Sequence, residues 1–308
     1  MKIKKTYLAL IGVGLVAPMV LYPVFLMKVL CFALFACAFN LLLGFVGLLS
    51  FGHAIFLGTG GYVTGYLVMN AGFTPELGIL CGTIAAAALG AVYGKLAVKR
   101  EGIYFAMVTL ALAQLMFFIY LQAPFTGGED GMQGIPRGEL FGLIDLSDNM
   151  NMYYFVFAIF LIGFTIIHRT IHSPFGQILK AIRENEDRAV SLGYSVNQYK
   201  WVAFIISSAL AGLAGSTKSL VFQLASLTDV HWHMSGEVVL MTLLGGMGTI
   251  FGPIVGAATV VSIQNYLSGG ELGNYIHIIM GLIFVICVLA FRNGIVGELQ
   301  KMVKKNFG

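Results

Sequence analysis

Few side chains in this chain could do chemistry, and most of them lie inside apolar segments. Residues 47–65 read GLLSFGHAIFLGTGGYVTG, where a serine, a histidine and two threonines stand among six glycines and apolar residues. Polar groups are costly to bury in apolar surroundings, so their presence in such a segment suggests a function. They could line a polar path across a membrane. The candidates for its wall are Ser50, His53, Thr59, Thr109, Gln114 and Glu237.

Structural alternatives stay open for these residues. A lone histidine on an apolar face is more often a core residue whose hydrogen bonds are satisfied, and this interpretation applies to His53. Glu237 stands near the start of a short apolar segment. It either lines the path or caps and orients that segment.

The sequence has no motif for covalent chemistry. H-E-x-x-H, G-x-S-x-G and paired carboxylates within an apolar segment are absent, so an intramembrane hydrolase is not supported. Residues 90–97, GAVYGKLA, have the wrong glycine spacing for a phosphate-binding loop, and Leu96 follows the lysine where serine or threonine is needed. His231 and His233 lack a third metal ligand. We therefore predict no enzyme activity, no metal and no cofactor bound by this chain, with ATP used by partner subunits.

Composition indicates an all-α membrane protein. Of the 308 residues, 58% are hydrophobic and 10% charged, the mean hydropathy is +0.88, and soluble domains carry roughly 25% charge. The apolar blocks are long enough to cross a bilayer, which takes about 20 residues. No separate soluble domain is present, so residues 1–308 form one transmembrane domain. The predicted spans are 7–27, 29–48, 53–69, 77–94, 102–122, 152–168, 201–222, 236–247, 249–268 and 274–291, the eighth too short to cross as a regular helix.

Charge predicts the orientation of these ten spans. Segments 1–6, 95–101, 169–200 and 292–308 hold 15 of the 18 lysines and arginines. Cytoplasmic loops of membrane proteins are rich in these residues, so both termini are predicted to be cytoplasmic. The net charge of +4 is therefore explained by the orientation of the spans in a lipid membrane, and it gives no indication of a nucleic-acid partner.

The inner loop 169–200 has residues that commonly start and end an amphipathic helix. Ser173 is a suitable N-cap, Pro174 suits the first helical position, and Gly193 can end the helix in a left-handed turn. The predicted apolar stripe consists of Ile178, Leu179, Ile182, Ala189 and Val190. The loop is either a solvated connection between two spans or a docking surface.

The glycines within the apolar segments also have two structural interpretations. Pairs four residues apart, such as Gly61 and Gly65, favour close helix packing in lipid. The crowded clusters 58–61 and 245–248 also permit unwound backbone, which transporters place beside a cavity.

Four stretches of the sequence resemble, in order, the membrane subunits of ABC importers of the branched-chain amino-acid type. They are EGIYFAMVTLALAQ, TGGEDGMQGIP, SPFGQILKAIRENEDRAVSLGYSVNQYKWVAFIISSALAGLAG and LLGGMGTIFGPIVGA. The resemblance extends from about residue 30 to 292 and favours the M-type over the H-type subunit of leucine/isoleucine/valine importers, because of the TGG…GIP loop.

This resemblance implies an import subunit for leucine, isoleucine and valine in the bacterial inner membrane, working by alternating access. The implied partners are a second related permease, two cytoplasmic ATP-binding subunits and a periplasmic substrate-binding protein. The inner loop would carry a coupling helix that docks on an ATPase, with the residues Arg183, Glu184, Asn185, Glu186, Asp187, Arg188 and Gly193. The outer loop 123–151 is acidic and rich in glycine, and its candidates for docking the binding protein are Gly127, Gly128, Glu129 and Asp130.

Other functions stay open at this point. The substrate could be another amino acid, urea or a short amide, and a related sugar permease would share the architecture. A secondary transporter driven by an ion gradient usually has an acidic residue in mid-membrane, and Glu237 is the one candidate in this sequence. A passive channel would leave the inner loop unexplained.

Overall fold

The computed structural model describes residues 2–268, 278–283, 285 and 294–298, and within them the chain is predominantly helical, as predicted. The long helices are α1 (Lys2–Val20), α2 (Pro23–Asn40), α3 (His53–Asn70), α4 (Pro75–Ala97), α5 (Gly102–Gln122), α6 (Asn149–His172), α9 (Val196–Phe222), α10 (Trp232–Gly245) and α11 (Gly252–Ser268). The shorter elements are the π-helix η1 (Leu41–Val46), the 3-10 turns η2 (Pro124–Thr126), η3 (Gly128–Asp130) and η4 (Leu227–Asp229), the helices α7 (Pro174–Glu184) and α8 (Glu186–Ser191), and the strands β1 (Met132–Gln133), β2 (Glu139–Leu140), β3 (Ile144–Asp145) and β4 (Leu224–Ala225).

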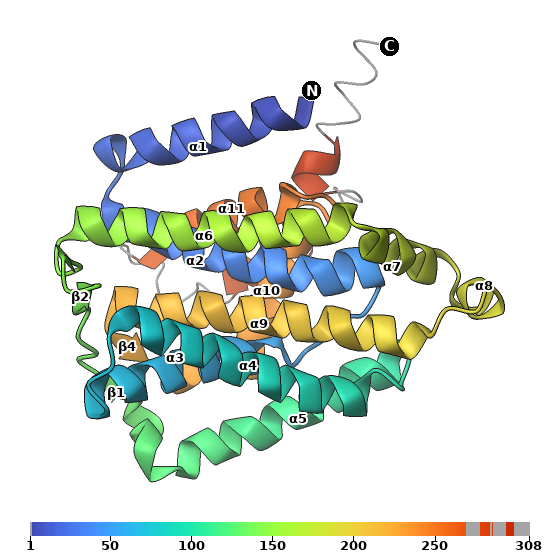
Figure 1. Ribbon diagram of the computed structural model, residues 1–308, viewed down its shortest axis with the longest axis horizontal. Helices are drawn as coiled ribbons and strands as arrows, with labels where there is room; N and C mark the ends of the chain where they lie inside the picture. The colour runs from blue at the N-terminus through green and yellow to red at the C-terminus, as the bar shows by residue number, and fades with distance from the viewer. Residues whose placement is uncertain (1, 269–277, 284, 286–293, 299–308) are drawn as a thin grey trace.

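Helix α2 lies at the centre of the bundle, with α6, α9, α10 and α11 packed against it (Figure 1). Helices α1 and α5 lie at opposite edges of the view. Five described segments are long and apolar enough to cross a membrane: α2 with η1, α4, α5, α6 and α9. Helix α5 exposes most of its apolar side chains, which suits a surface in contact with lipid or another membrane subunit. The chain is therefore a multi-pass membrane protein.

Glycines bring α3 very close to α4 and α9. A Cβ at Gly60 would overlap the Gly212 carbonyl group, and a Cβ at Gly215 would overlap the Leu57 carbonyl group. Such contacts give the van der Waals packing on which helix association in lipid depends. Helix α3 is unbroken through Gly58, Gly60 and Gly61, so unwinding at this cluster, the alternative interpretation, is wrong. The close approach of the α3 and α9 backbones requires glycine at these positions.

The helices are interrupted at two other places. The π-helix η1 ends at Gly47, whose φ of 85° is left-handed, and residues 47–52 lead without a regular helix to α3. Helix α10 ends at Gly245, and residues 246–251 lead to α11, with φ values of 121° at Gly246 and 76° at Gly248. Glycine adopts such angles without steric cost. The predicted interruption at 245–248 is confirmed, and α10 is short, as expected.

The remaining span predictions agree with the described helices except at some boundaries. The predicted boundary at Lys28 is wrong, because α1 ends at Val20 and Pro23 begins α2. Proline has a fixed φ that suits the first helical turn, so the chain turns before it. The predicted span 274–291 lies mostly outside the described residues, as does the predicted cytoplasmic C-terminus.

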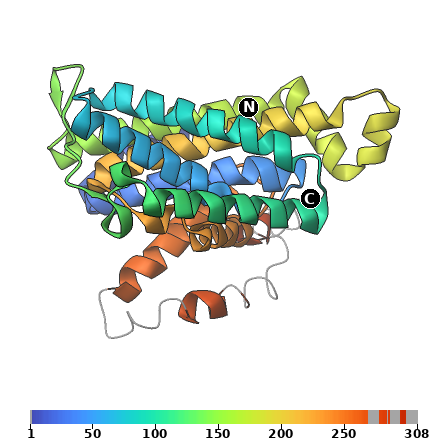
Figure 2. The same ribbon diagram turned by 90° about the horizontal axis from the view of Figure 1, so that it is seen from below.

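Connecting segments gather at the two ends of the bundle. Helices α7 and α8 lie at one end, beside the start of α5 (Figure 1). The loop between α5 and α6 lies at the opposite end, where β1 pairs antiparallel with β4. In Figure 2, α11 and the helical residues 278–283 project from one face of the bundle.

We expect Gly215→Ala to destabilise the protein by about 3 kcal/mol, the upper end of ordinary overpacking, because the new methyl group meets the backbone carbonyl of Leu57. Thermal unfolding of the purified protein in detergent measures the effect. Gly12→Ala on α1 is the matched control, since its new methyl group has no neighbour within 4 Å. Equal unfolding temperatures for the two variants would contradict the packing argument.

Candidate functional site

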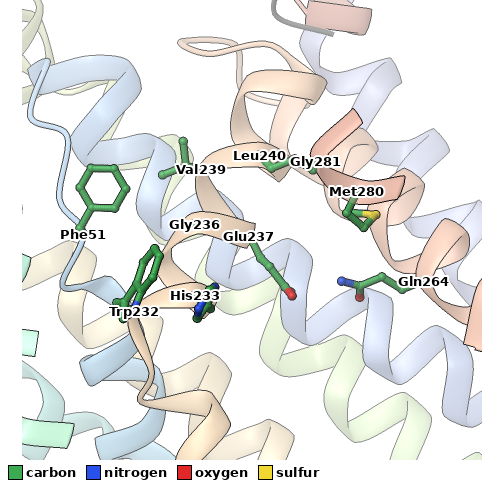
Figure 3. Close-up of a pocket in the computed structure, with 10 residues that line it drawn as sticks. All are labelled: Phe51, Trp232, His233, Gly236, Glu237, Val239, Leu240, Gln264, Met280 and Gly281. Carbon is green, nitrogen blue, oxygen red and sulfur yellow. The ribbon is translucent and has the colours of Figure 1, made fainter. Parts of the chain in front are cut away.

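A cavity of about 360 Å³ opens beside α10 and α11. Its lining residues are Phe51, Trp232, His233, Gly236, Glu237, Val239, Leu240, Gln264, Met280 and Gly281. The Glu237 and Gln264 side chains extend toward each other across this space, with Met280 beside Gln264 (Figure 3). The rest of the wall is mainly apolar and aromatic. The cavity can therefore hold a molecule with both a polar group and an apolar group.

Glu237 is the one sequence candidate that lines this cavity. It lies in the second turn of α10 and is partly buried. The cap of α10 is His231, whose Nδ1 accepts a hydrogen bond from the His233 N–H at 3.4 Å. Burial and the neighbouring His233 lower the pKa of His231, which favours the neutral ring that can accept this bond. Glu237 is thus not the cap, and its carboxylate has no hydrogen bond or ion pair with any described residue.

Thr109 does not line this cavity, but it holds in place a residue that does. Its Oγ1 accepts a hydrogen bond from the Phe51 N–H at 3.2 Å and donates to the Ala106 carbonyl at 2.9 Å. Phe51 is a lining residue, so α5 positions this part of the wall. Ser50, directly before it, is fully buried and accepts from the Gly52 N–H at 3.2 Å. Both side chains hold the linker 47–52 in place.

His53 is fully buried among the rings of Phe39, Phe56 and Phe204. Its Nε2 lies 2.7 Å from Ser207 Oγ, which in turn donates to the Ala38 carbonyl at 2.6 Å. Because the serine has one proton and the carbonyl can only accept, His53 Nε2–H is the donor in its bond. His53 thereby connects α3 to α9 and α2, and these contacts are those of a packed core histidine. Its pathway role stays a prediction.

Thr59 and Gln114 lie away from the cavity wall. Thr59 Oγ1 accepts a hydrogen bond from the Tyr120 hydroxyl at 2.8 Å, and the Tyr120 ring stacks on Tyr62 with centroids 5.0 Å apart. Gln114 is half-buried on α5 and has no hydrogen bond with a described residue. The structure therefore brings together Ser50, Thr109 and the cavity wall, but not all six candidates.

The inner loop forms two helices instead of the one predicted. Ser173 caps α7 by accepting from the Gly176 N–H, as predicted, but Asn185 is extended at φ −158° and ψ 103°. Its Oδ1 accepts from the Arg188 N–H at 2.9 Å and starts α8. Asparagine is a strong N-cap, so it ends one helix and begins another. Gly193 follows α8 at φ 88°, the left-handed turn expected there.

The charged coupling candidates have different surroundings. Glu184, Asp187 and Arg188 are exposed. Glu186 forms an ion pair with the buried Lys200 of α9 at 2.5 Å, and Arg183 Nη1 donates to the Gly44 carbonyl of η1. Val190 is exposed as well, so its predicted place on the buried stripe is wrong. The turn at Asn185 rotates α8 relative to α7, which separates Val190 from the apolar face of Leu179 and Ile182.

The outer loop is held to the bundle by backbone and side-chain bonds. Met132 and Gln133 pair with Ala225 and Leu224, respectively. Arg137 donates to the Val221 carbonyl at 2.8 Å, and burial lowers its pKa, although an arginine keeps its charge. Just before β1, the docking candidates Gly127, Glu129 and Asp130 are exposed, while Gly128 is partly buried. The loop thus presents its acidic residues from a fixed base.

Sequence reasoning missed several residues that shape the site. Gln264 is a polar residue inside a predicted span, so the signal that selected Gln114 could have found it. Phe51 and Trp232 gave no such signal, because aromatic residues are common in membrane segments. The ion pair between Lys218 of α9 and Asp229 of η4 is likewise visible only in three dimensions.

Comparison with known proteins gives consistent results. The family model for the branched-chain amino acid transport system permease component matches residues 23–288. The high-affinity branched-chain amino acid transport system permease protein LivM of Salmonella typhimurium is 28% identical over 294 residues, covering 87% of this chain and 68% of that protein. A probable LivM of Methanocaldococcus jannaschii is 26% identical, with 61% and 54% covered, and LivH of Escherichia coli is 23% identical, with 88% and 93% covered. No solved structure matches the chain.

We expect Lys218→Met to destabilise the protein by about 3 kcal/mol, because it leaves the Asp229 carboxylate buried without its partner. The double substitution with Asp229→Asn should recover part of this loss. Unfolding in detergent measures both effects, with Lys99→Met, at an exposed lysine, as control. A double variant no more stable than Lys218→Met would show that the two charges do not act as a pair.

Proposed function

The chain belongs to the family of branched-chain amino-acid transport permease components, and from this membership we propose that it is a membrane subunit of an ATP-driven importer for leucine, isoleucine and valine. The observation that carries the proposal is the cavity at Glu237 and Gln264, together with the amphipathic α7–α8 segment at one end of the bundle. The first would take the substrate, and the second would receive the force that moves it.

The chemistry of the cavity suits an amino acid with an apolar side chain. The Glu237 carboxylate can accept hydrogen bonds from an ammonium group, and Gln264 can both donate and accept. Phe51, Leu240 and Met280 supply apolar surface for a branched side chain. Urea and short amides would use the amide and carboxylate but leave this apolar surface without a partner, so we favour the amino acids.

The proposed topology has ten spans with both termini in the cytoplasm and α7–α8 on the inner side of the bacterial inner membrane. The asymmetry of lysine and arginine supports this orientation. Residues 1–308 would form a single permease domain. A second, related permease would pair with this chain and complete the path, and the relatives named LivM and LivH support such a pair.

Partner subunits would use the ATP, since this chain has no phosphate-binding loop and is proposed to hold no cofactor. The cytoplasmic ATPases would dock on residues 184–193, and Arg183, bonded to the Gly44 carbonyl, would couple that segment to the bundle. Exposed charges at Glu184, Asp187 and Arg188 stand beside the exposed apolar side chains of Val190 and Leu192. Such a mixed surface suits an interface that releases as well as binds. A periplasmic binding protein would dock on residues 127–130 at the opposite end.

We expect Glu237→Gln to lower leucine uptake by about tenfold while the complex stays assembled, because the amide removes a charge-assisted bond to the ammonium group. Uptake is measured in liposomes that contain the complete purified complex, the loaded binding protein and ATP. Glu139→Gln, at an exposed carboxylate of β2, is the matched control. ATP-independent uptake by this chain alone would contradict the importer and favour a secondary transporter or channel.

The double substitution Glu184→Ala/Asp187→Ala should weaken docking of the ATPases, because it removes two exposed carboxylates from the proposed interface. Affinity purification of the tagged chain, with the ATPases quantified by mass spectrometry, measures this directly. Glu139→Ala removes a carboxylate at the other end of the molecule and controls for charge. Full recovery of ATPases and normal uptake in the double variant would place docking elsewhere.

A further inference from the structure

We propose that Arg183, Gly44 and Asn40 form a joint that transmits movement of α7 to the α10–α11 hairpin at the cavity. The joint is defined here as these three residues together with the segment 246–249. The inference rests on the proposed function, because it assigns an internal route for the force that the ATPases would apply. It gives Arg183, which bonds to the Gly44 carbonyl, a role different from that of the docking residues that follow it.

Asn40 provides the fixed side of the joint. It ends α2, is 3% exposed, and uses both ends of its side-chain amide. Its Nδ2 donates to the Thr249 carbonyl at 2.8 Å, and its Oδ1 accepts from the Gly248 N–H at 3.0 Å. A buried amide with both groups satisfied holds one geometry. The interruption between α10 and α11 is therefore attached to the central helix at two adjacent residues.

The π-helix η1 provides the surface for Arg183. Carbonyls in the last turn of a helix lack backbone partners, and a cation is favourable there. Arg183 Nη1 donates to one of them, that of Gly44. A Cβ at Gly44 would overlap Asn40 Oδ1 and lie 2.7 Å from the Gly248 nitrogen, so a glycine is needed for α2 and the segment 246–249 to meet. The π-helical turn, a geometry frequent at functional sites, lies in this joint.

Arg183 also reaches the interruption itself. Its Nη1 would lie 3.2 Å from a Cβ at Gly248, and its Cγ would lie 3.2 Å from a Cβ at Gly47. The Arg183 side chain is thus packed beside both glycine turns, with its aliphatic part at Gly47 and its guanidinium group at Gly248. The planar group has five donors in a fixed fork, which makes it suitable for a contact shared by several backbone segments.

The two moving parts are each firmly packed. Leu179 and Ile182 bury the apolar face of α7, so Arg183 moves with that helix. On the other side, a Cβ at Gly245 would overlap the Gly252 carbonyl and one at Gly256 would overlap the Met241 carbonyl. Helices α10 and α11 therefore behave as one hairpin, and a shift of its turn is carried to the cavity wall.

A second attachment of the inner loop leads away from the cavity. Glu186 pairs with Lys200, and Phe175 stacks on Tyr199 with centroids 5.6 Å apart. Both contacts end on α9, which contributes no residue to the cavity lining. Two contacts of α7 end instead on η1, next to the hairpin turn: the bond from Arg183 to the Gly44 carbonyl and the Lys180 ammonium group over the Phe45 ring. Of these two side chains, Arg183 is the one that also lies beside Gly248 of the turn.

The test uses the complete complex in liposomes with the loaded binding protein, and it measures ATP hydrolysis and leucine uptake together. In Arg183→Ala we expect the ATPases to remain bound and to hydrolyse ATP, while uptake per ATP falls about tenfold, an ordinary size for coupling between sites. Arg183→Lys keeps the charge and should restore part of the coupling. Arg169→Ala, at an exposed arginine of α6, is the matched control and should change neither quantity.

Asn40→Leu tests the other side of the joint, because it keeps similar volume and loses both hydrogen bonds. It should reduce uptake per ATP as Arg183→Ala does, and the double variant should be little worse than either single one, since residues of one unit are not additive. Unchanged uptake per ATP in Arg183→Ala would overturn the joint, and so would loss of the ATPases from that complex. A wild-type complex with no ATP-driven uptake would instead contradict the proposed function itself.

Discussion

The hydrogen-bonding demand of the backbone in lipid governs this structure. Hydrocarbon offers no partner for an N–H or carbonyl group, so a helix can be interrupted in a membrane protein only where other groups of the protein replace the lost bonds. The described part of the chain has two such interruptions, at 47–52 and 246–251. Thr109 Oγ1 and Ser50 Oγ bond the backbone of the first, and Asn40 bonds the backbone of the second. The irregular segments are therefore as well determined as the helices they separate.

Glycine has two separate roles in this architecture. In α3 and α9 the missing side chains permit close contact between unbroken helices, and these contacts form the firm side of the bundle. At Gly47 and Gly248 the positive φ angles permit sharp turns beside Arg183 of the inner loop. The same residue type thus permits close helix packing at some positions and a change of chain direction at others. What differs is the backbone angle, since Gly47 and Gly248 have positive φ values while the glycines of α3 and α9 lie within regular helices.

The sequence predicts the helices well because apolar length and charge are local properties. It also predicts the cap at Ser173 and the turn at Gly193, since both depend on neighbouring residues. It does not separate the two roles of glycine, because the approach of Leu57 to Gly215 depends on tertiary packing. The break at Asn185 has a local cause in its N-capping side chain, but the sequence alone does not show that this cap is used. A continuous helix and a recapped pair of helices have similar local patterns, and the burial of Ile182 and Lys200 decides between them.

The candidates for a polar path are best separated by whether their hydrogen-bonding groups already have partners in the chain. Ser50, Thr59 and Thr109 bond to described neighbours, and His53 has one ring nitrogen bonded inside a box of aromatic rings. Glu237 and Gln264 have no such partners among the described residues, and both face the same cavity (Figure 3). Desolvating a carboxylate without a partner is unfavourable, and besides the electrostatic interaction of Glu237 with Lys28, water, a substrate or a second subunit can supply a hydrogen-bond partner. Under the proposed function, the path would therefore run beside Glu237 and Gln264, along α10 and α11.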